Sequence, residues 1–188
     1  MTNKEYEDII RQKDLIIDLY KNELLILKDM LEKYKEVAFT DSLTNLHNRR
    51  SLNIAEDSYD SIIFGDIDHF KRINDEHGHD FGDLVLVEVS NVLKRIVRES
   101  DLVCRWGGEE FVILLKNCND EDAYNKAIEL KNEIAALSEK FGFEITMSFG
   151  ISRNTGKTLK DAIDEADKAM YESKEKGRNT ITIYKLSK

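Results

Sequence analysis

The chain has 188 residues and a formal net charge of -9, and 41% of its residues are hydrophobic. This length and composition predict one globular domain with a sizeable core, together with an appendage. The acidic balance argues against a protein that binds a nucleic-acid polymer, because such proteins normally present a basic face. It leaves open a small phosphate-bearing ligand, for which a few local cations and a metal ion suffice.

The two cysteines, Cys104 and Cys118, are too few for a disulfide framework. Both stand in apolar, strand-like surroundings, so we expect buried free thiols, which suit a reducing cytoplasm. No apolar run approaches the roughly 20 residues that span a bilayer. The first ten residues also lack the basic-then-apolar form of a signal peptide. We therefore expect a cytoplasmic chain without a membrane segment.

A long helix is predicted for residues 5–38, which contain neither glycine nor proline. Two largely apolar rows recur in it every seven residues, one from Ile10 and one from Tyr6. Such a seam favours a parallel coiled coil that joins two copies of the chain. An amphipathic helix packed on its own domain is the alternative. The predicted organisation is a coiled-coil stalk at residues 1–38 and a globular domain at residues 39–188.

The globular part alternates strand-like and helix-like segments. The predicted elements are a short helix after residues 40–50, a strand at 61–68, a polar turn at 74–83, a helix at 84–100, a β-hairpin around Gly107 and Gly108, a helix at 121–140, a strand at 143–152, a helix at 159–176 and a strand at 180–184. This order predicts an α+β fold with the sheet on one side and the helices on the other.

Four carboxylates are candidates for a metal site. Asp66 and Asp68 lie two apart and share one face of a strand. If that strand lies beside the hairpin, Asp66 and Glu109 converge and, with a main-chain carbonyl, suit a hard cation such as Mg²⁺. Glu110 can join Glu109 only through the turn. Spacing alone leaves a solvated hairpin equally open, and Asp68 is predicted to cap the helix that follows it.

Basic residues that could bind a phosphate group occur in two segments of the sequence. The sequence has neither a Walker-type loop nor GxGxxG, so a phosphate cradle would come from the turn at 66–71, whose amides begin a helix. Lys71 lies in that turn, and Lys174 and Arg178 lie four apart on the last predicted helix. A solvated, cationic helix end is the alternative for these two residues.

Several of these segments together carry a family resemblance. RWGGEEF (residues 105–111), with Gly107 and Gly108, resembles the signature of the GGDEF family of diguanylate cyclases. Four other segments resemble the family's motifs in order and spacing: DSLTNLHNRR, with His47 where proline is common, DIDHFKRINDEHGHDFGD, EITMSFGIS and ADKAMYESKEKGRNTI. The five matches span about residues 39–184 and are specific as a set.

The resemblance implies a palm-like fold with a ferredoxin-like core, shared with class III nucleotide cyclases and polymerases. It implies that two GTP molecules become cyclic di-GMP and two pyrophosphates, with Mg²⁺ as cofactor and Mn²⁺ as a substitute. Glu110 matches a metal ligand or the group that helps activate the 3′-hydroxyl. The matching residues are Asp66, Glu109, Glu110 and the Ile67 carbonyl for catalysis and metal, Asn74 and Asp83 for guanine, and Phe70, Lys71, Lys174 and Arg178 for phosphate.

The chemistry of the guanine positions agrees with this assignment. The Asp83 carboxylate can accept from the N1–H and N2–H₂ groups of guanine, which adenine lacks, and the Asn74 amide offers a donor and an acceptor. A site built for these bonds rejects a base that leaves them unpaired. The product is symmetric and needs two GTP molecules, so a two-fold homodimer held by the stalk is the expected catalyst.

The segment RESD adds a candidate regulatory site. Arg98 and Asp101 form an R-x-x-D pattern, which is common by chance and also fits a cationic helix end before a turn. At this distance from Gly107 it resembles the family's product-inhibition site, where cyclic di-GMP binds.

Two other functional classes compete with an active, product-inhibited cyclase. One is a catalytically silent GTP or cyclic di-GMP receptor that signals through its coiled coil, and the other is a structural dimeriser. The intact pair Glu109 and Glu110 favours the enzyme. A structural dimeriser does not explain why Asp66, Asn74 and Asp83 occur together.

Overall fold

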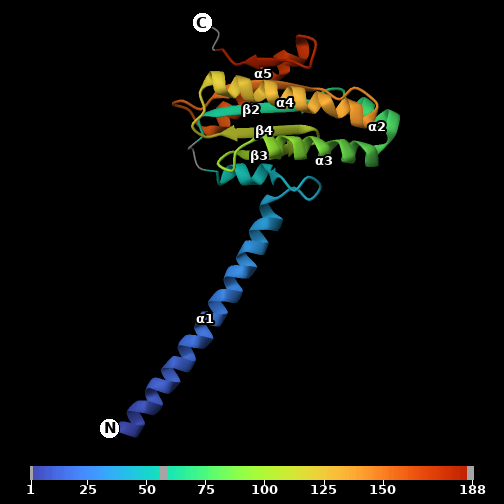
Figure 1. Ribbon diagram of the computed structural model, residues 1–188. Coiled ribbons are helices and arrows are strands. Elements are labelled where there is room, and N and C mark those ends of the chain that lie inside the picture. Colours follow the sequence, from blue (N-terminus) through green and yellow to red (C-terminus); the bar gives the residue numbers. More distant parts are fainter. Residues whose placement is uncertain (1, 56–58, 186–188) are drawn as a thin grey trace. The chain divides into compact units, whose positions relative to one another are not determined.

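The structure is a computed structural model that describes residues 2–55 and 59–185 (Figure 1). The chain divides into two compact units, Met1–Ala38 and Phe39–Lys188, and the last three residues of the predicted globular domain lie outside the described part. None of the described helices is both long and apolar enough to cross a membrane.

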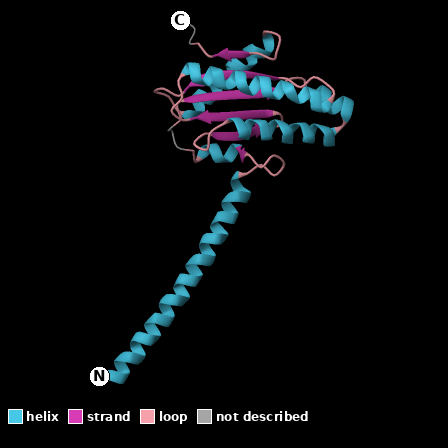
Figure 2. Ribbon diagram, viewed as in Figure 1, coloured by secondary structure: helices cyan, strands magenta, loops and turns pink. Residues whose placement is uncertain are grey.

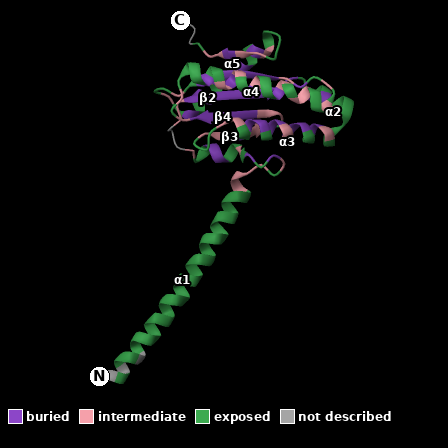
Figure 3. Cartoon of the chain, in the orientation of Figure 1, coloured by how far each residue is buried: buried purple, intermediate pink, exposed green. Residues whose placement is uncertain are grey.

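Helix α1 (Asn3–Phe39) forms the first unit and matches the predicted long helix. The seam residues Ile10, Ile17, Leu24 and Leu31 are 44% to 56% exposed in the single chain. Figure 3 shows the same exposure along most of the helix. Apolar side chains at heptad spacing that remain in solvent are those that a second helix would cover. The coiled coil stays a prediction.

A mixed sheet organises the second unit, and within the described residues it has six strands in the order β1-β3-β4-β2-β5-β6. The strands are β1 (His47–Asn48), β2 (Ser61–Ile67), β3 (Leu102–Gly107), β4 (Glu110–Leu115), β5 (Met147–Arg153) and β6 (Ile181–Ile183). The other elements are the 3₁₀ helix η1 (Arg49–Asn53) and the helices α2 (Phe70–His77), α3 (His79–Ile96), α4 (Asp120–Phe141) and α5 (Leu159–Glu175).

Helices cover both faces of this sheet, so the predicted arrangement with all helices on one side is wrong (Figure 2). On β2, Ile62 and Phe64 pack with the apolar residues of α5, whereas Ile63 and Ile67 pack with those of α3 and α4. Every residue of β2 is buried. A nearly unbroken apolar run is typical of a strand that is covered on both faces.

The predicted polar turn at 74–83 is also wrong, because α2 runs to His77 and α3 begins at His79. Only Gly78 separates the two helices, with a φ of 89° that a residue with a side chain rarely adopts. Apart from the half-buried Asn74, the polar residues of this segment occupy exposed helical positions. Helix α3 ends at Ile96, earlier than predicted, and β5 begins only at Met147.

Helix α5 lies unusually close to the sheet at Gly150 of β5. A Cβ atom on Gly150 would overlap with the Ala166 carbonyl oxygen and the Met170 amide nitrogen, both of which belong to the backbone of α5. Beside this contact, the Ser173 hydroxyl donates to the Phe149 carbonyl at 2.7 Å. The missing side chain therefore sets the position of the helix that carries Lys174.

The two cysteines differ in their surroundings. Cys104 is fully buried on β3, and burial is the main cause that raises the pKa of its thiol to about 12. Cys118 is half-buried in the loop between β4 and α4, so the prediction of a buried strand position was wrong for it. The two thiols are free.

We expect Gly150→Ala to lower the free energy of unfolding by roughly 1–3 kcal/mol, the usual cost of overpacking. The reason is that α5 must move away from β5 to make room for the added methyl group. Chemical denaturation monitored by circular dichroism measures this change. Gly107→Ala is the matched control, since its Cβ would be 3.5 Å from the nearest atom, the Glu110 Oε2. An equal loss of stability in both variants would contradict the close approach of α5.

Candidate active site

The pairing of β2 with β4 places Asp66 directly opposite Glu110. The Ile67 amide donates to the Glu109 carbonyl oxygen at 3.3 Å, which extends the pairing to the turn. Glu109 lies in the turn and Glu110 begins β4, so the turn brings the two successive carboxylates towards one strand end. The strand that carries Asp66 thus lies beside the hairpin, as expected, while the convergence of Asp66 and Glu109 on a metal ion stays a prediction.

Arg105 fixes the shape of this turn. Its Nε donates to the Gly108 carbonyl oxygen at 3.0 Å, and its Nη1 lies 3.1 Å from the Asp41 carboxylate. Gly108 has a φ of 34°, and the pairing of β3 with β4 shifts between Arg105 and Gly107. The irregular hairpin end is therefore held by a cation from β3 and an acid from the segment that enters the domain.

Asp66 is more deeply buried than Glu109 and Glu110, and its side chain is 7% exposed. The Lys174 Nζ lies 2.8 Å from Asp66 Oδ1. The pKa of Asp66 is raised to about 6: burial is the largest cause, Lys174 opposes it, and the charges of Glu109 and Glu110 add to it. Asp66, Glu109 and Glu110 thus lie close enough to affect one another's charge, and Lys174 forms an ion pair with Asp66.

The charges of two residues that the sequence did not indicate, Asp167 and Arg49, affect the pKa of Glu110. Burial is the main cause that raises its pKa, the Asp167 and Glu109 carboxylates raise it further, and the cations Lys174 and Arg49 oppose the shift. Asp167 lies seven residues before Lys174 on α5, and this helical spacing could have indicated that both residues share a face. Arg49 also lies over the Trp106 ring at 4.0 Å, which no local pattern reveals.

The donor atoms at this strand end are of the chemical types that suit a hard divalent cation. Asp66, Glu109 and Glu110 offer carboxylate oxygens, and the neighbouring Ile67 offers a main-chain carbonyl, the ligand types that Mg²⁺ prefers. Among the described residues, no three acidic, histidine or cysteine side chains are grouped closely enough to hold a metal ion. In this arrangement the Lys174 ammonium supplies the positive charge beside Asp66.

Asp68 does not cap α2, which corrects the prediction from the sequence. The residue at the cap is His69, which has a φ of 57° and makes no side-chain capping bond. The buried Asp68 carboxylate instead accepts from the Thr146 hydroxyl at 2.8 Å, the Ser148 hydroxyl at 2.6 Å and the Asn179 amide at 3.0 Å. It therefore ties β5 and the loop after α5 to the start of α2.

The candidate phosphate residues come from these connected segments. Phe70 is buried and Lys71 exposed at the start of α2. Lys174 lies in the last turn of α5, but Arg178 lies beyond the helix with a φ of 65°, so the prediction that both residues are helical is wrong. Since the next residue, Asn179, donates to Asp68, the loop that carries Arg178 is attached beside α2.

The candidate guanine residues come from two helices. Asn74 is half-buried on α2, and Asp83 is exposed on α3. The Asn74 carbonyl oxygen accepts from the Gly78 amide at 2.8 Å, and the Gly78 carbonyl oxygen accepts from the Gly82 amide at 3.2 Å. These bonds define the junction between the two helices.

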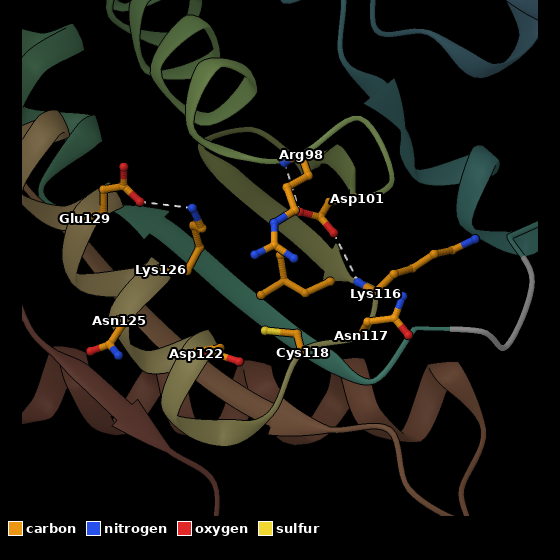
Figure 4. A pocket seen from close by; sticks show the side chains of 10 residues that line it. Arg98, Asp101, Lys116, Asn117, Cys118, Asp122, Asn125, Lys126 and Glu129 are labelled. Carbon is orange, nitrogen blue, oxygen red and sulfur yellow. Dashed lines mark hydrogen bonds and ion pairs between the residues drawn. The ribbon is translucent and has the colours of Figure 1, made fainter.

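Arg98 and Asp101 line a separate cavity of about 220 Å³, which is drawn in Figure 4. The Asp101 carboxylate accepts from the Arg98 amide at 3.0 Å and the Lys116 amide at 3.1 Å, so it holds the loop that presents Arg98. On α4, the Lys126 Nζ lies 3.0 Å from Glu129 Oε2. Three cationic residues, Arg98, Lys116 and Lys126, therefore line the cavity together with several acids.

The comparisons with known proteins identify the family. Residues 38–180 match the family model for the diguanylate cyclase GGDEF domain, and the chain belongs to this family. Diguanylate cyclase A of Treponema denticola is 35% identical over 158 residues, which cover 81% of this chain and 42% of that protein. The response regulator PleD of Caulobacter vibrioides is 37% identical over 172 residues, covering 82% of this chain and 38% of that protein. The chain spans less than half of these relatives.

Solved structures resemble a larger part of the chain. The coiled coil and GGDEF domain of DgcB from Caulobacter crescentus, in complex with c-di-GMP, has a TM-score of 0.79 and 28% identity and covers 90% of this chain and 98% of that one. The diguanylate cyclase SiaD from Pseudomonas aeruginosa, in complex with its activator SiaC, has a TM-score of 0.79 and 29% identity. The match covers 96% of this chain and 75% of the SiaD chain.

We expect the contribution of Asp66 to the free energy of unfolding to fall as the pH rises from about 4 to 7 without metal, because the folded state holds the Asp66 proton up to a pKa of about 6. The rise above the ordinary value of 3.8 corresponds to about 3 kcal/mol at neutral pH. Asp66→Asn should therefore unfold at a higher temperature than the wild type at pH 7.5, with a smaller difference at pH 4.5.

Thermal unfolding in a metal chelator, followed at several pH values, tests this expectation. Asp75→Asn, which changes an exposed carboxylate on α2, is the control. If both variants keep the pH profile of the wild type, the buried carboxylate is not the cause of the profile.

Proposed function

We propose that this chain is a diguanylate cyclase that condenses two GTP molecules into cyclic di-GMP and releases two pyrophosphates. The observation that carries the proposal is the pairing of β2 and β4, which sets Asp66 opposite Glu110 with Lys174 on Asp66, in a member of the diguanylate cyclase GGDEF-domain family. Carboxylates at the end of adjacent central strands, with helices on the sheet, are what a palm-like nucleotidyl-transfer domain with a ferredoxin-like core requires.

The proposed metal ligands are Asp66, Glu109, Glu110 and the Ile67 carbonyl. Mg²⁺, or Mn²⁺ in its place, supplies charge stabilisation at the attacking and leaving oxygens when it is bound. Lys71 and Arg178, together with Lys174, are the cations for the phosphate groups, and the Phe70 main chain contributes the amide at the start of α2.

Each of the two chemical steps forms one phosphorus–oxygen bond and breaks another. The 3′-oxygen of one GTP attacks the α-phosphorus of the other, and the bond from that phosphorus to its bridging oxygen breaks as pyrophosphate leaves with the electron pair. Glu110 accepts the 3′-hydroxyl proton, a role that suits a carboxylate whose pKa burial has raised. Positioning and electrostatic stabilisation carry the rate, and no covalent enzyme intermediate is needed.

The substrate is selected by its base. Asp83 accepts from the N1–H and N2–H₂ of guanine, and Asn74 provides a donor and an acceptor at the same base. Adenine would leave these polar groups unpaired, which is costly in a binding site.

The working enzyme is a homodimer. One domain holds one GTP, and a symmetric product requires two domains that face each other. Residues 1–38 would form the parallel coiled-coil stalk, and residues 39–188 the cyclase domain, so that the encounter of the two domains becomes intramolecular. The exposed apolar seam of α1 supports this assignment.

The purified chain should convert GTP into cyclic di-GMP in the presence of Mg²⁺, and Glu110→Gln should lose the activity by roughly a hundredfold or more, because it removes a charged ligand and the proton acceptor. Chromatography and mass spectrometry of the nucleotides measure the product. If neither chain forms product after copurified cyclic di-GMP has been removed, a silent nucleotide receptor becomes the better hypothesis.

We also propose that cyclic di-GMP inhibits the enzyme at the cavity of Arg98 and Asp101. Arg98→Ala should raise the product concentration that halves the initial rate by at least about tenfold, because a guanidinium binds phosphate through charge-assisted hydrogen bonds. Arg95→Ala is the matched control, since Arg95 lies nearby on α3 but pairs with Glu133 at 2.8 Å. Equal product inhibition of Arg98→Ala and the wild type would remove the proposed site.

A further inference from the structure

The interior of α3 contains a glycine, Gly82, which helix propensity alone disfavours. Its φ does not lie in the left-handed region, so its backbone conformation does not require glycine. Gly82 is buried against α2. The reason for glycine here must therefore be the space that a side chain would take.

That space is filled by Asn74. A Cβ atom on Gly82 would overlap with Asn74 Oδ1 and would lie 3.0 Å from Asn74 Cγ and 3.2 Å from the tip of the Phe70 ring. Of these neighbours, the Asn74 carboxamide is the end of a flexible side chain, whereas Phe70 is buried in the core. An added methyl group would displace the carboxamide.

The backbone around this contact is held independently. The Gly78 amide donates to the Asn74 carbonyl oxygen at 2.8 Å, and the Gly82 amide donates to the Gly78 carbonyl oxygen at 3.2 Å. Helix α3 is further anchored by buried residues such as Val85 and Leu86. A side chain at position 82 can therefore be accommodated by rotation of Asn74 while α2 and α3 remain in place.

We infer that Gly82 is a positioning residue for base selection, because its missing side chain gives the Asn74 carboxamide the volume in which it reads guanine. The inference rests on the proposed function, in which Asn74 and Asp83 bind the base. It adds that the orientation of Asn74 is set from α3 rather than from α2 alone. A side chain added at position 82 should therefore be tolerated by the fold but should weaken the discrimination between guanine and adenine.

The test is Gly82→Ala in the full chain, with equilibrium binding of the α,β-methylene analogues of GTP and ATP, in which the bond that breaks during the reaction is blocked. We expect the preference for the GTP analogue to fall by about tenfold, the effect of one lost hydrogen bond to the base. The melting temperature should stay equal or rise, since alanine is the better helix former.

A double-mutant cycle with Asn74→Ala separates this role from general packing. In the Asn74→Ala background, Gly82→Ala should change the GTP preference no further, because the displaced group is already absent. Leu84→Ala, at an exposed position of α3, is the control for a change in the helix that leaves Asn74 untouched, and it should keep the wild-type preference.

The outcomes are distinguishable. If the wild type binds neither analogue, the proposed function fails together with this inference. If the wild type prefers the GTP analogue and Gly82→Ala keeps that preference, only the inference is overturned. A lower melting temperature with unchanged preference, or an equal additional loss in the Asn74→Ala background, would also overturn it, because either result assigns Gly82 to packing alone.

Discussion

The antiparallel pairing of β2 with β4 is the constraint on which the candidate site depends. It sets Asp66 opposite Glu110 and joins the Ile67 amide to the Glu109 carbonyl oxygen, so acids from distant parts of the chain meet at one strand end. A shift of the register by one residue would turn the side chain of Asp66 to the other face. The pairing holds because both strands are almost entirely buried, and a register slipped by one residue would move their side chains into the opposite core, where they do not fit.

The cationic side of the site depends on how α5 meets the sheet. Gly150 lets the backbone of α5 approach β5, and Ser173 binds the Phe149 carbonyl, so the next residue, Lys174, reaches Asp66. Asp68 then connects β5 and the loop after α5 to the start of α2. The proposed phosphate-binding residues, which lie far apart in the sequence, are thereby connected by one buried carboxylate whose oxygens accept three hydrogen bonds.

The proposed guanine side is built separately, on the junction of α2 and α3. Here a glycine in a helix gives up helix stability in exchange for room beside Asn74. The two sides lie on different elements of one domain, as the proposed site requires if it holds a nucleotide by its phosphates and selects it by its base. A symmetric dinucleotide needs two such sites, and the exposed seam of α1 is suited to pair two chains.

The sequence by itself determined the long first helix, the hairpin, the buried strand β2 and the set of motif residues, because periodicity and turn chemistry are recorded in neighbouring residues. Only the tertiary structure decided that Asp68 is a link between segments instead of a helix cap, that Arg178 lies beyond α5, and that helices cover both faces of the sheet. The partners of Asp68 stand 78 to 111 residues away along the chain. Such contacts depend on how the elements pack, and no local pattern encodes them.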